Sequence, residues 1–336
     1  MTTTKAVDSA VLPGSTAPSL LRRFLASPLA GPVIALVLAV AFFSFQSDRF
    51  LTGSNFALIL GQVMVVATIG IGQTLIILTA GIDLACGAIM AFGAIVMTKL
   101  AVDQGMNAYL TIAAGIAVCA IFGLVNGLLV TKINLPPFIV TLGMLSIATA
   151  ATLIYADGAT INGLPELMRF LGKTFTIFGT EVRYGIVLTL LLYVIFAFVL
   201  SSTSYGKHVY AVGSNPEGAR LSGIPVKKIL LSVYVIAGVL YGIAALLLVA
   251  RTGVGDPKAA TGEYNLDSIT AVVLGGTSLF GGRGLVIGTL IGAVIVGVFR
   301  NGLQLMQIDS SYQTLVTGVL VILAVAVDQL SRRRAR

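Results

Sequence analysis

The 336-residue chain has few charged residues, only 10% of the total, and it contains no tryptophan, one histidine and two cysteines. A water-soluble domain carries about 25% charged residues. His208 has no cysteine or histidine neighbour, so no metal site is expected, and Cys86 and Cys119 lie in apolar runs as small packing residues. The sequence contains no Walker A motif, paired carboxylates or Ser/His/Asp set, so we expect no catalytic site and no bound nucleotide.

Apolar residues make up 57% of the chain and recur in runs of about 20, the length that crosses a bilayer. This pattern predicts an all-α polytopic membrane protein with about ten transmembrane helices. The expected spans are 29–45, 56–79, 83–101, 107–130, 137–155, 184–201, 229–250, 266–280, 285–306 and 312–330.

The distribution of basic residues predicts the orientation. With the N-terminus inside, 13 of the 21 Lys and Arg residues lie on the cytoplasmic side, as the positive-inside rule requires. The net charge of +8 therefore reports topology, and no nucleic-acid partner is expected. We expect a cytoplasmic tail at 1–28, a transmembrane domain at 29–330 and a basic cytoplasmic tail at 331–336. Within that domain, loop 201–228 is inside, and loop 156–183 is outside and forms one interfacial helix.

Asp83 interrupts the apolar stretch "TLIILTAGIDLACGAIMAFGAIV". A lone carboxylate in hydrocarbon is costly and commonly functional. Gly81 suits a helix end and Asp83 an N-cap, which favours a capping role where two spans meet at the cytoplasmic side. A proton or ion site and a structural corner on a transport path are the alternatives.

An internal repeat links the two halves of the chain. Aligned at an offset of 175 residues, "FGLVNGLLVTKINLPPFIVTLGML" matches "GVFRNGLQLMQIDSSYQTLVTGVL" in register, with Asn126 opposite Asn301. The two copies run in opposite directions in the predicted topology, as in transporters built from inverted repeats. Chance similarity between two glycine-rich helices is the alternative.

Glycines at four-residue spacing predict close helix packing. They occur at Gly123/Gly127, Gly238/Gly242 and Gly284/Gly288/Gly292. The glycine-rich stretch "GGTSLFGGRG" (275–284) lacks the features of a phosphate-binding loop, and we expect a tight turn between two helices there.

The loop 201–228 contains "SNPEGARLSGI", which has the signals of a short helix. Asn215 suits the N-cap, Pro216 the first position and Glu217 the first turn, while Gly223 ends the helix. Ala219, Leu221 and Ile224 are expected to form a small apolar face. Such a helix is either a docking element or a surface helix lying on the protein's own inner face.

Four stretches, in order and covering about residues 30–330, resemble the ribose-type sugar permeases of bacterial ABC importers. They are "AGIDLACGAIMAFGAIV", "NGLLVTKINLPPFIVTLGM", "YAVGSNPEGARLSGIPV" and "LDSITAVVLGGTSLFGGRGLVIGTLIGA". The family pattern Gly-Ile-Asp-Leu-Ser-x-Gly is matched except that Ala85 replaces the serine, so a role carried by that hydroxyl does not transfer.

The resemblance implies a fold similar to vitamin B12-type permeases and a homodimer, or a pair of related chains, in the bacterial inner membrane. It implies a periplasmic sugar-binding protein and a separate cytoplasmic ATPase that carries ATP and Mg, so that this chain needs no cofactor. The substrate would be a monosaccharide such as ribose, xylose, fructose or galactose. The ATPase-coupling residues would be Gly213, Asn215, Pro216, Glu217, Ala219, Arg220, Leu221, Gly223 and Ile224.

Two other functions stay open. One is an ABC permease for a non-sugar solute, such as autoinducer-2, a nucleoside or a branched amino acid. The other is a self-sufficient ion-coupled transporter, which would need titratable groups inside the spans. Candidate path or helix-break residues are Gly81, Asp83, Asn126, Thr277, Ser278 and Asn301, although these polar groups could equally bond between helices.

Overall fold

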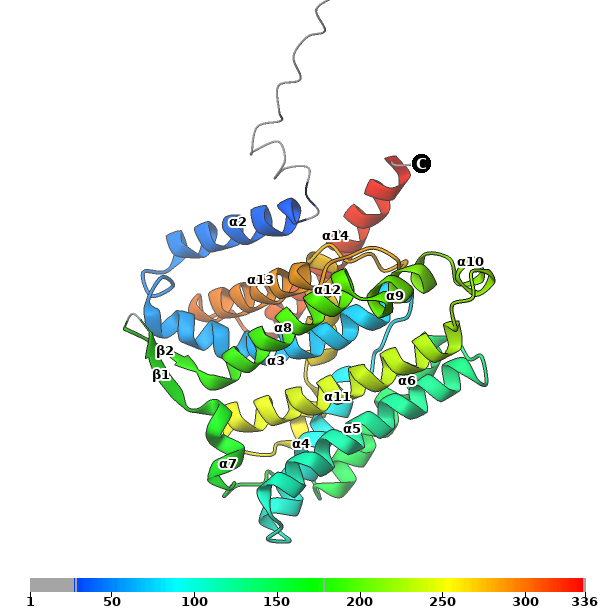
Figure 1. Cartoon of the computed structure of the whole chain (residues 1–336). Helices are drawn as coiled ribbons and strands as arrows, with labels where there is room; N and C mark the ends of the chain where they lie inside the picture. Colours follow the sequence, from blue (N-terminus) through cyan, green and yellow to red (C-terminus); the bar gives the residue numbers. More distant parts are fainter. Residues whose placement is uncertain (1–26, 28, 178, 335–336) are drawn as a thin grey trace, which may run out of the picture.

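The structure, a computed structural model, describes residues 27, 29–177 and 179–334. Its long helices lie side by side in stacked layers, with α2 along one edge and α5 and α6 along the opposite edge (Figure 1). Most of the expected tail at 1–28, together with residues 335–336, lies outside the described residues.

Each of the ten expected spans contains a helix, and shorter elements fill the connections. The long elements are α2 (Ala30–Gln46), α3 (Gly53–Leu78), α4 (Cys86–Val102), α5 (Ala108–Thr131), α6 (Pro137–Tyr155), α8 (Tyr184–Ser202), α11 (Val226–Thr252), α13 (Val286–Leu305) and α14 (Ser310–Arg334). The short ones are α7 (Glu166–Arg169), η1 (Phe170–Gly172), β1 (Thr174–Ile177), β2 (Thr180–Arg183), α9 (Ser204–Ser214), α10 (Pro216–Leu221), η2 (Pro257–Thr261) and α12 (Tyr264–Leu274).

Six helices of the described residues are long and apolar enough to cross a membrane, namely α3, α5, α6, α8, α11 and α13. The expected span at 266–280 is wrong as a continuous helix, because α12 has only 11 residues. At 1.5 Å per residue it reaches about 16 Å, roughly half of the hydrocarbon thickness. The chain is therefore a polytopic helical membrane protein in which at least one apolar segment crosses only part of the bilayer as a helix.

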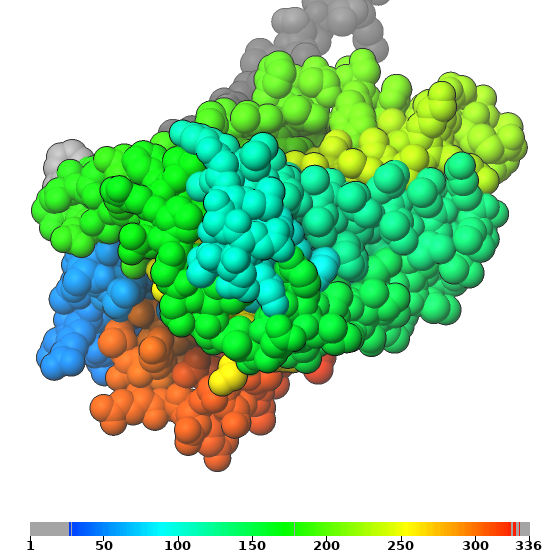
Figure 2. Space-filling model, turned by 90° about the horizontal axis from the view of Figure 1, so that it is seen from below, coloured from blue at the N-terminus to red at the C-terminus, as the bar shows by residue number. Residues whose placement is uncertain are grey.

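The six spanning helices fall into a central and an outer group. In their most apolar windows, α3 and α11 are each 72% buried and α13 is 67% buried, whereas α5, α6 and α8 are 28%, 28% and 22% buried. Seen from below, α5 and α6 cover a broad part of the surface (Figure 2). The outer helices therefore present apolar side chains to lipid or to another membrane chain.

Close backbone contacts hold the central helices to their neighbours. A Cβ on Gly238 of α11 would lie 2.5 Å from the carbonyl oxygen of Cys119 in α5, and one on Gly292 of α13 would lie 1.9 Å from that of Ala271 in α12. These contacts confirm the predicted role of spaced glycines in packing. Gly284 is an exception, because it precedes α13 and has a φ of +148°.

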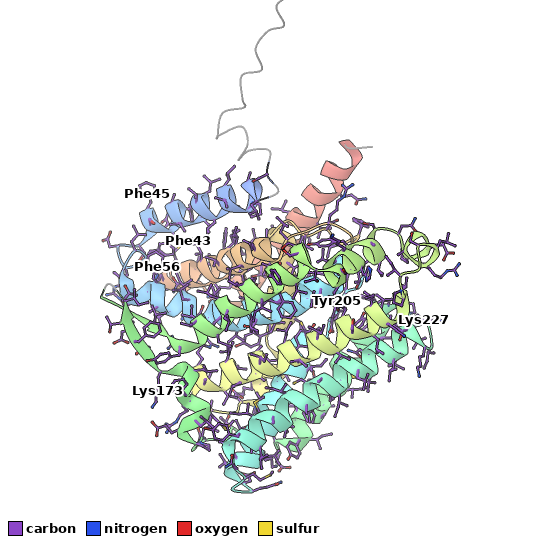
Figure 3. The ribbon with its side chains drawn as sticks, in the orientation of Figure 1. Phe43, Phe45, Phe56, Lys173, Tyr205 and Lys227 are labelled. Atoms are coloured by element: carbon purple, nitrogen blue, oxygen red, sulfur yellow. The ribbon has the colours of Figure 1, made fainter. Side chains whose placement is uncertain are left out.

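Helix α2 joins the bundle through one face only. Phe43 is buried and packs edge-on against Phe299 of α13, with 5.5 Å between ring centroids. Phe45 is 90% exposed and points away from the bundle (Figure 3). This distribution is typical of a peripheral membrane helix, since its outward apolar side chains can contact lipid.

The prediction of one interfacial helix in loop 156–183 is wrong. Only α7 and η1 are helical there, and β1 and β2 form an antiparallel hairpin in which Thr174 pairs with Arg183. The β-branched residues of these short strands favour extended backbone, and Gly179, with a φ of +77°, suits the turn between them. Lys173 of this loop and Lys227 beside α10 lie at opposite ends of the molecule (Figure 3).

Candidate functional site

The segment 201–228 folds into two helices, α9 and α10, and the second has the predicted ends. The Asn215 side chain accepts a hydrogen bond from the Gly218 N–H at 2.9 Å, and Pro216 follows at the first helical position. Gly223 has a φ of +82°, and the Ile224 N–H donates to the Ala219 carbonyl at 3.0 Å. Local sequence signals were therefore sufficient to predict α10.

The three residues expected to form an apolar face on α10 differ in exposure. Leu221 is 74% exposed, whereas Ala219 is 5% exposed and Ile224 is half-buried against the bundle. Leu221 is therefore the apolar side chain available to a partner. Beside it, the exposed Arg220 Nη2 lies 2.6 Å from Glu217 Oε1. The two hydrogen bonds that the Arg220 Nε and Nη2 donate to Glu217 lower the pKa of the Glu217 carboxyl, so the pair stays ionised at neutral pH.

Helix α9 rests on the end of α3 and on the glycine-rich loop 275–285. A Cβ on Gly213 would lie 1.7 Å from the Leu78 carbonyl oxygen, which also accepts a hydrogen bond from the Gly282 N–H at 2.9 Å. The Tyr210 hydroxyl donates to the Gly284 carbonyl at 2.8 Å. The loop is longer than the tight turn expected from the sequence. A force applied to α9 therefore reaches two chain segments directly.

The end of α3 continues directly into residues 79–85, a non-helical break between α3 and α4 that contains Gly81 and Asp83. Asp83 is 1% exposed, and its Oδ1 accepts from the Ala85 N–H at 2.8 Å. Its Oδ2 accepts from the Tyr241 hydroxyl at 3.1 Å, and its backbone carbonyl accepts from Gln73 Nε2 at 3.1 Å. The carboxylate thus fixes the break and ties it to the central helix α11, and the backbone carbonyl of Asp83 ties it to α3.

The expected N-cap role of Asp83 needs correction. Ala85 occupies the N-cap of α4, and within the described chain it makes no side-chain capping bond. Asp83 bonds the Ala85 N–H one step before the helix, in an Asx turn. Because Asp83 also bonds Tyr241 in the middle of α11, it lies inside the bundle and not at its surface.

The N-termini of α4 and α12 meet in the interior. The Gly87 N–H donates to Asn265 Oδ1 at 2.5 Å, and the Cys86 sulfur lies 3.3 Å from the Ser268 hydroxyl oxygen. A Cβ on Gly87 would collide with Tyr264 and Asn265. Two helices that each follow a break and start next to each other inside a membrane bundle resemble the discontinuous helices of transporters, whose N-terminal N–H groups face the solute.

The other candidate path residues do not converge on one place. Thr277 and Ser278 are buried in the 275–285 loop, next to the break at 79–85, since a Cβ on Gly281 would lie 2.8 Å from the Ala80 nitrogen. Asn301 lies elsewhere, in a reciprocal amide pair with Asn55 at 2.8 and 2.9 Å. Asn126 is buried in α5, and neither of its amide atoms has a partner among the described residues.

Sequence reasoning missed the partners of Asp83 and the contact between α4 and α12. Gln73, Tyr241 and Asn265 are polar residues in largely apolar helices, and that polarity was the available signal. Their roles depend on contacts across 158 residues for Tyr241 and Asp83, and 178 residues for Asn265 and Gly87. Such pairings follow from the tertiary fold and not from local spacing.

Comparison with known proteins identifies the class. A family model described as the permease component of a branched-chain amino acid transport system matches residues 55–325. The chain therefore belongs to this family of transport-system permease components. The match confirms the resemblance found in the sequence, and the six apolar helices agree with a multi-pass membrane protein.

Curated relatives are similar over nearly the whole chain. The fructose import permease protein FrcC of Rhizobium meliloti is 43% identical over 323 residues, covering 94% of this chain and 89% of the relative. The ribose import permease protein RbsC of Escherichia coli K12 is 40% identical over 302 residues, covering 88% and 92%. The D-allose transport system permease protein AlsC of the same strain is 35% identical over 300 residues, covering 89% and 90%.

Proposed function

We propose that this chain is the permease subunit of an ATP-driven (ABC) importer that moves a monosaccharide, a pentose or hexose, across the bacterial inner membrane. The observation that carries the proposal is the end-to-end similarity to permeases named for fructose, ribose and allose import. The family description names branched-chain amino acids, but these relatives favour a sugar.

The chain is a transport subunit and not an enzyme. ATP and Mg belong to a separate cytoplasmic ATPase, and a periplasmic sugar-binding protein delivers the solute. Exposed Leu221 and the ion pair between Glu217 and Arg220 on α10 support docking of the ATPase at α9–α10. The remaining coupling residues act on the conformation of the segment, because they fix its close contacts and its turns. They are Gly213, Asn215, Pro216 and Gly223.

Both termini of the chain are cytoplasmic in this proposal, and the molecule has ten membrane segments with an inverted repeat. The order of elements supports the repeat: a 26-residue helix, a break, the shorter α4, then α5 and α6 correspond to the 27-residue α11, a break, α12, α13 and α14. The outer helices that leave apolar faces open support a pairing of two permease copies within the lipid bilayer.

The two helix breaks are the proposed moving parts. The break at 79–85 follows α3 at the end that contacts α9, and the break at 253–263 follows α11 at the opposite end. Closure of the ATPase dimer would press on α9, and the contacts at Leu78 and Gly282 would pass that movement to the first break and to Thr277 and Ser278.

Deletion and complementation test the proposal. A strain lacking this chain should lose uptake of at least one labelled monosaccharide from a panel of fructose, ribose, allose and arabinose, and a plasmid copy should restore it. Leucine uptake, measured in parallel, should not change. Unaltered uptake of every sugar, with leucine uptake lost, would overturn the assignment to sugars.

A further inference from the structure

A cavity lies at the end of the molecule opposite α10. It has a volume of about 640 Å³ and is lined by the first half of α3, Ala94 of α4, the last turn of α11, the break at 253–263, α12, α13 and the start of α14. Small-molecule sites in proteins have volumes of about 300–1,000 Å³. In the proposed orientation this outer cavity faces the side from which a binding protein would release its solute.

The charges around the outer cavity balance. Its wall includes three basic and three acidic residues, which are Arg251, Lys258 and Arg300, and Asp256, Glu263 and Asp267. A solute with a net charge of either sign therefore gains no overall attraction. Carboxylates accept and guanidinium groups donate hydrogen bonds, so this wall suits a neutral solute rich in hydroxyl groups.

Three of these charged residues, Arg300, Asp267 and Glu263, are already paired with each other. Arg300 Nη1 donates to the 2%-exposed Asp267 carboxylate at 2.8 Å, and Arg300 Nη2 bonds Glu263, which also accepts from the Thr314 hydroxyl. A zwitterion such as an amino acid would have to break these pairs to match its own charges to them. A hydroxyl group can donate a hydrogen bond to a remaining lone pair of these carboxylates without breaking the ion pairs.

Two buried atoms in the same wall lack partners. Among the described residues, neither the Gln62 side-chain carbonyl oxygen nor the Arg251 Nε makes a hydrogen bond, although Arg251 Nη2 donates to the Tyr264 hydroxyl at 3.1 Å. One is an acceptor and the other a donor. Buried polar groups are normally paired, and a hydroxyl can both donate and accept.

We propose that the outer cavity is a low-affinity transit site for a monosaccharide, in which Gln62 and Arg251 hydrogen-bond its hydroxyl groups. Apolar side chains of Val66 and Leu248 complete the wall and face the C–H surface of the sugar ring. This inference rests on the proposed function and adds to it a binding site within a single chain, apart from the docking surface.

Substrate protection of a cysteine tests the site. Gln304→Cys, with Cys86→Ser and Cys119→Ala, places one reactive thiol on the cavity wall of the full chain in proteoliposomes. At sugar concentrations on the order of 10 mM and a Kd of about 1 mM, an impermeant thiol reagent should react about tenfold more slowly. The probe is the sugar from the panel of fructose, ribose, allose and arabinose whose uptake the deletion abolishes. Leucine is the comparison solute, and Thr160→Cys in the exposed loop is the matched control.

Adding Gln62→Leu should weaken the protection, because one hydrogen bond is worth about fivefold in affinity. If Gln304→Cys does not fold, Ser310→Cys on the same wall replaces it. Equal rates with and without sugar, or protection by leucine and not by sugar, would overturn the transit site. Sugar uptake by the unmodified importer is measured alongside, so that a failed cavity is distinguished from a failed sugar assignment.

Discussion

At the scale of residues, Asp83 shows how a carboxylate is accommodated inside an apolar bundle. Its oxygens accept from the Ala85 N–H and the Tyr241 hydroxyl, so one side chain provides the hydrogen-bond acceptor for both buried donors. In Asp83→Asn the amide oxygen still accepts from Ala85, and the Tyr241 hydroxyl can turn to accept from the amide NH₂. We expect this variant to lose about 1 kcal/mol of stability or less and to keep most of its uptake.

Asp83→Leu should be far more damaging, since it leaves the buried Ala85 N–H without an acceptor, at about 1–3 kcal/mol, and leaves the Tyr241 hydroxyl only the long contact to Gln73 Oε1 at 3.5 Å. The thermal unfolding midpoint of the purified protein and the uptake rate are measured for both variants. If Asp83→Asn kept a normal midpoint and membrane level but lost uptake, a charge at this position would be required for transport. The ion-coupled alternative would then be favoured.

Residue-scale prediction succeeded where the signal is local. Asn215, Pro216 and Gly223 define α10 through capping and turn preferences that depend on a few neighbouring residues. For Asp83 the same preferences indicated a cap at the next helix. The bond to Tyr241, which decides the role of the carboxylate, joins residues 158 positions apart and leaves no local trace.

At the scale of elements, α10 carries the docking prediction. Leu221→Asp places a charge on the exposed tip, where an ATPase groove would have to bury it unpaired, so binding should weaken strongly. The permease itself should fold normally because Leu221 makes little contact within the chain. Co-purification of the ATPase and sugar-stimulated ATP hydrolysis should both fall at least about fivefold, for a cost of about 1–3 kcal/mol.

Thr160→Asp at the opposite end is the matched control, since it adds the same charge at an exposed position away from α10. Glu217→Gln should have a smaller effect, because exposed ion pairs contribute little. Ala219→Asp is not a useful docking variant, since Ala219 is buried in the chain itself. Unchanged co-purification and hydrolysis in Leu221→Asp would mean that α10 is a surface turn and not a docking element.

The existence of the helices could be predicted from apolar runs, but their lengths at the breaks could not. The run at 266–280 is largely apolar and was expected to span, yet α12 stops at Leu274 and the chain continues as the 275–285 loop. Positive φ values at Gly276, Gly281 and Gly282 make that loop possible. Hydropathy alone does not distinguish a whole helix from a half helix followed by a buried loop.

At the scale of the whole molecule, the orientation can be tested by labelling. Single cysteines are introduced at Thr160 or Ser222, which are both exposed and lie at opposite ends of the molecule. The background chain lacks the buried Cys86 and Cys119. In intact cells with a permeable outer membrane, an impermeant thiol reagent should label Thr160→Cys, and Ser222→Cys should react only after the inner membrane is opened. Labelling of both from the periplasmic side would contradict cytoplasmic placement of α10.

The arrangement of the helices is the part that composition could not predict. Nearly every span is apolar on all sides, so the sequence does not separate the central α3, α11 and α13 from the outer α5, α6 and α8. Glycine spacing predicted that some helices pack closely, but not that α5 packs on α11 or α12 on α13. The partners of each helix come from shape complementarity in three dimensions.

The central claim is that an ATPase acting on α9–α10 drives sugar import through this chain. The most direct measurement is accumulation of labelled sugar in proteoliposomes that contain the permease, its ATPase and the loaded binding protein. We expect accumulation only when ATP is present on the ATPase side, with no dependence on an imposed proton or sodium gradient. Accumulation driven by either gradient without ATP would contradict the claim.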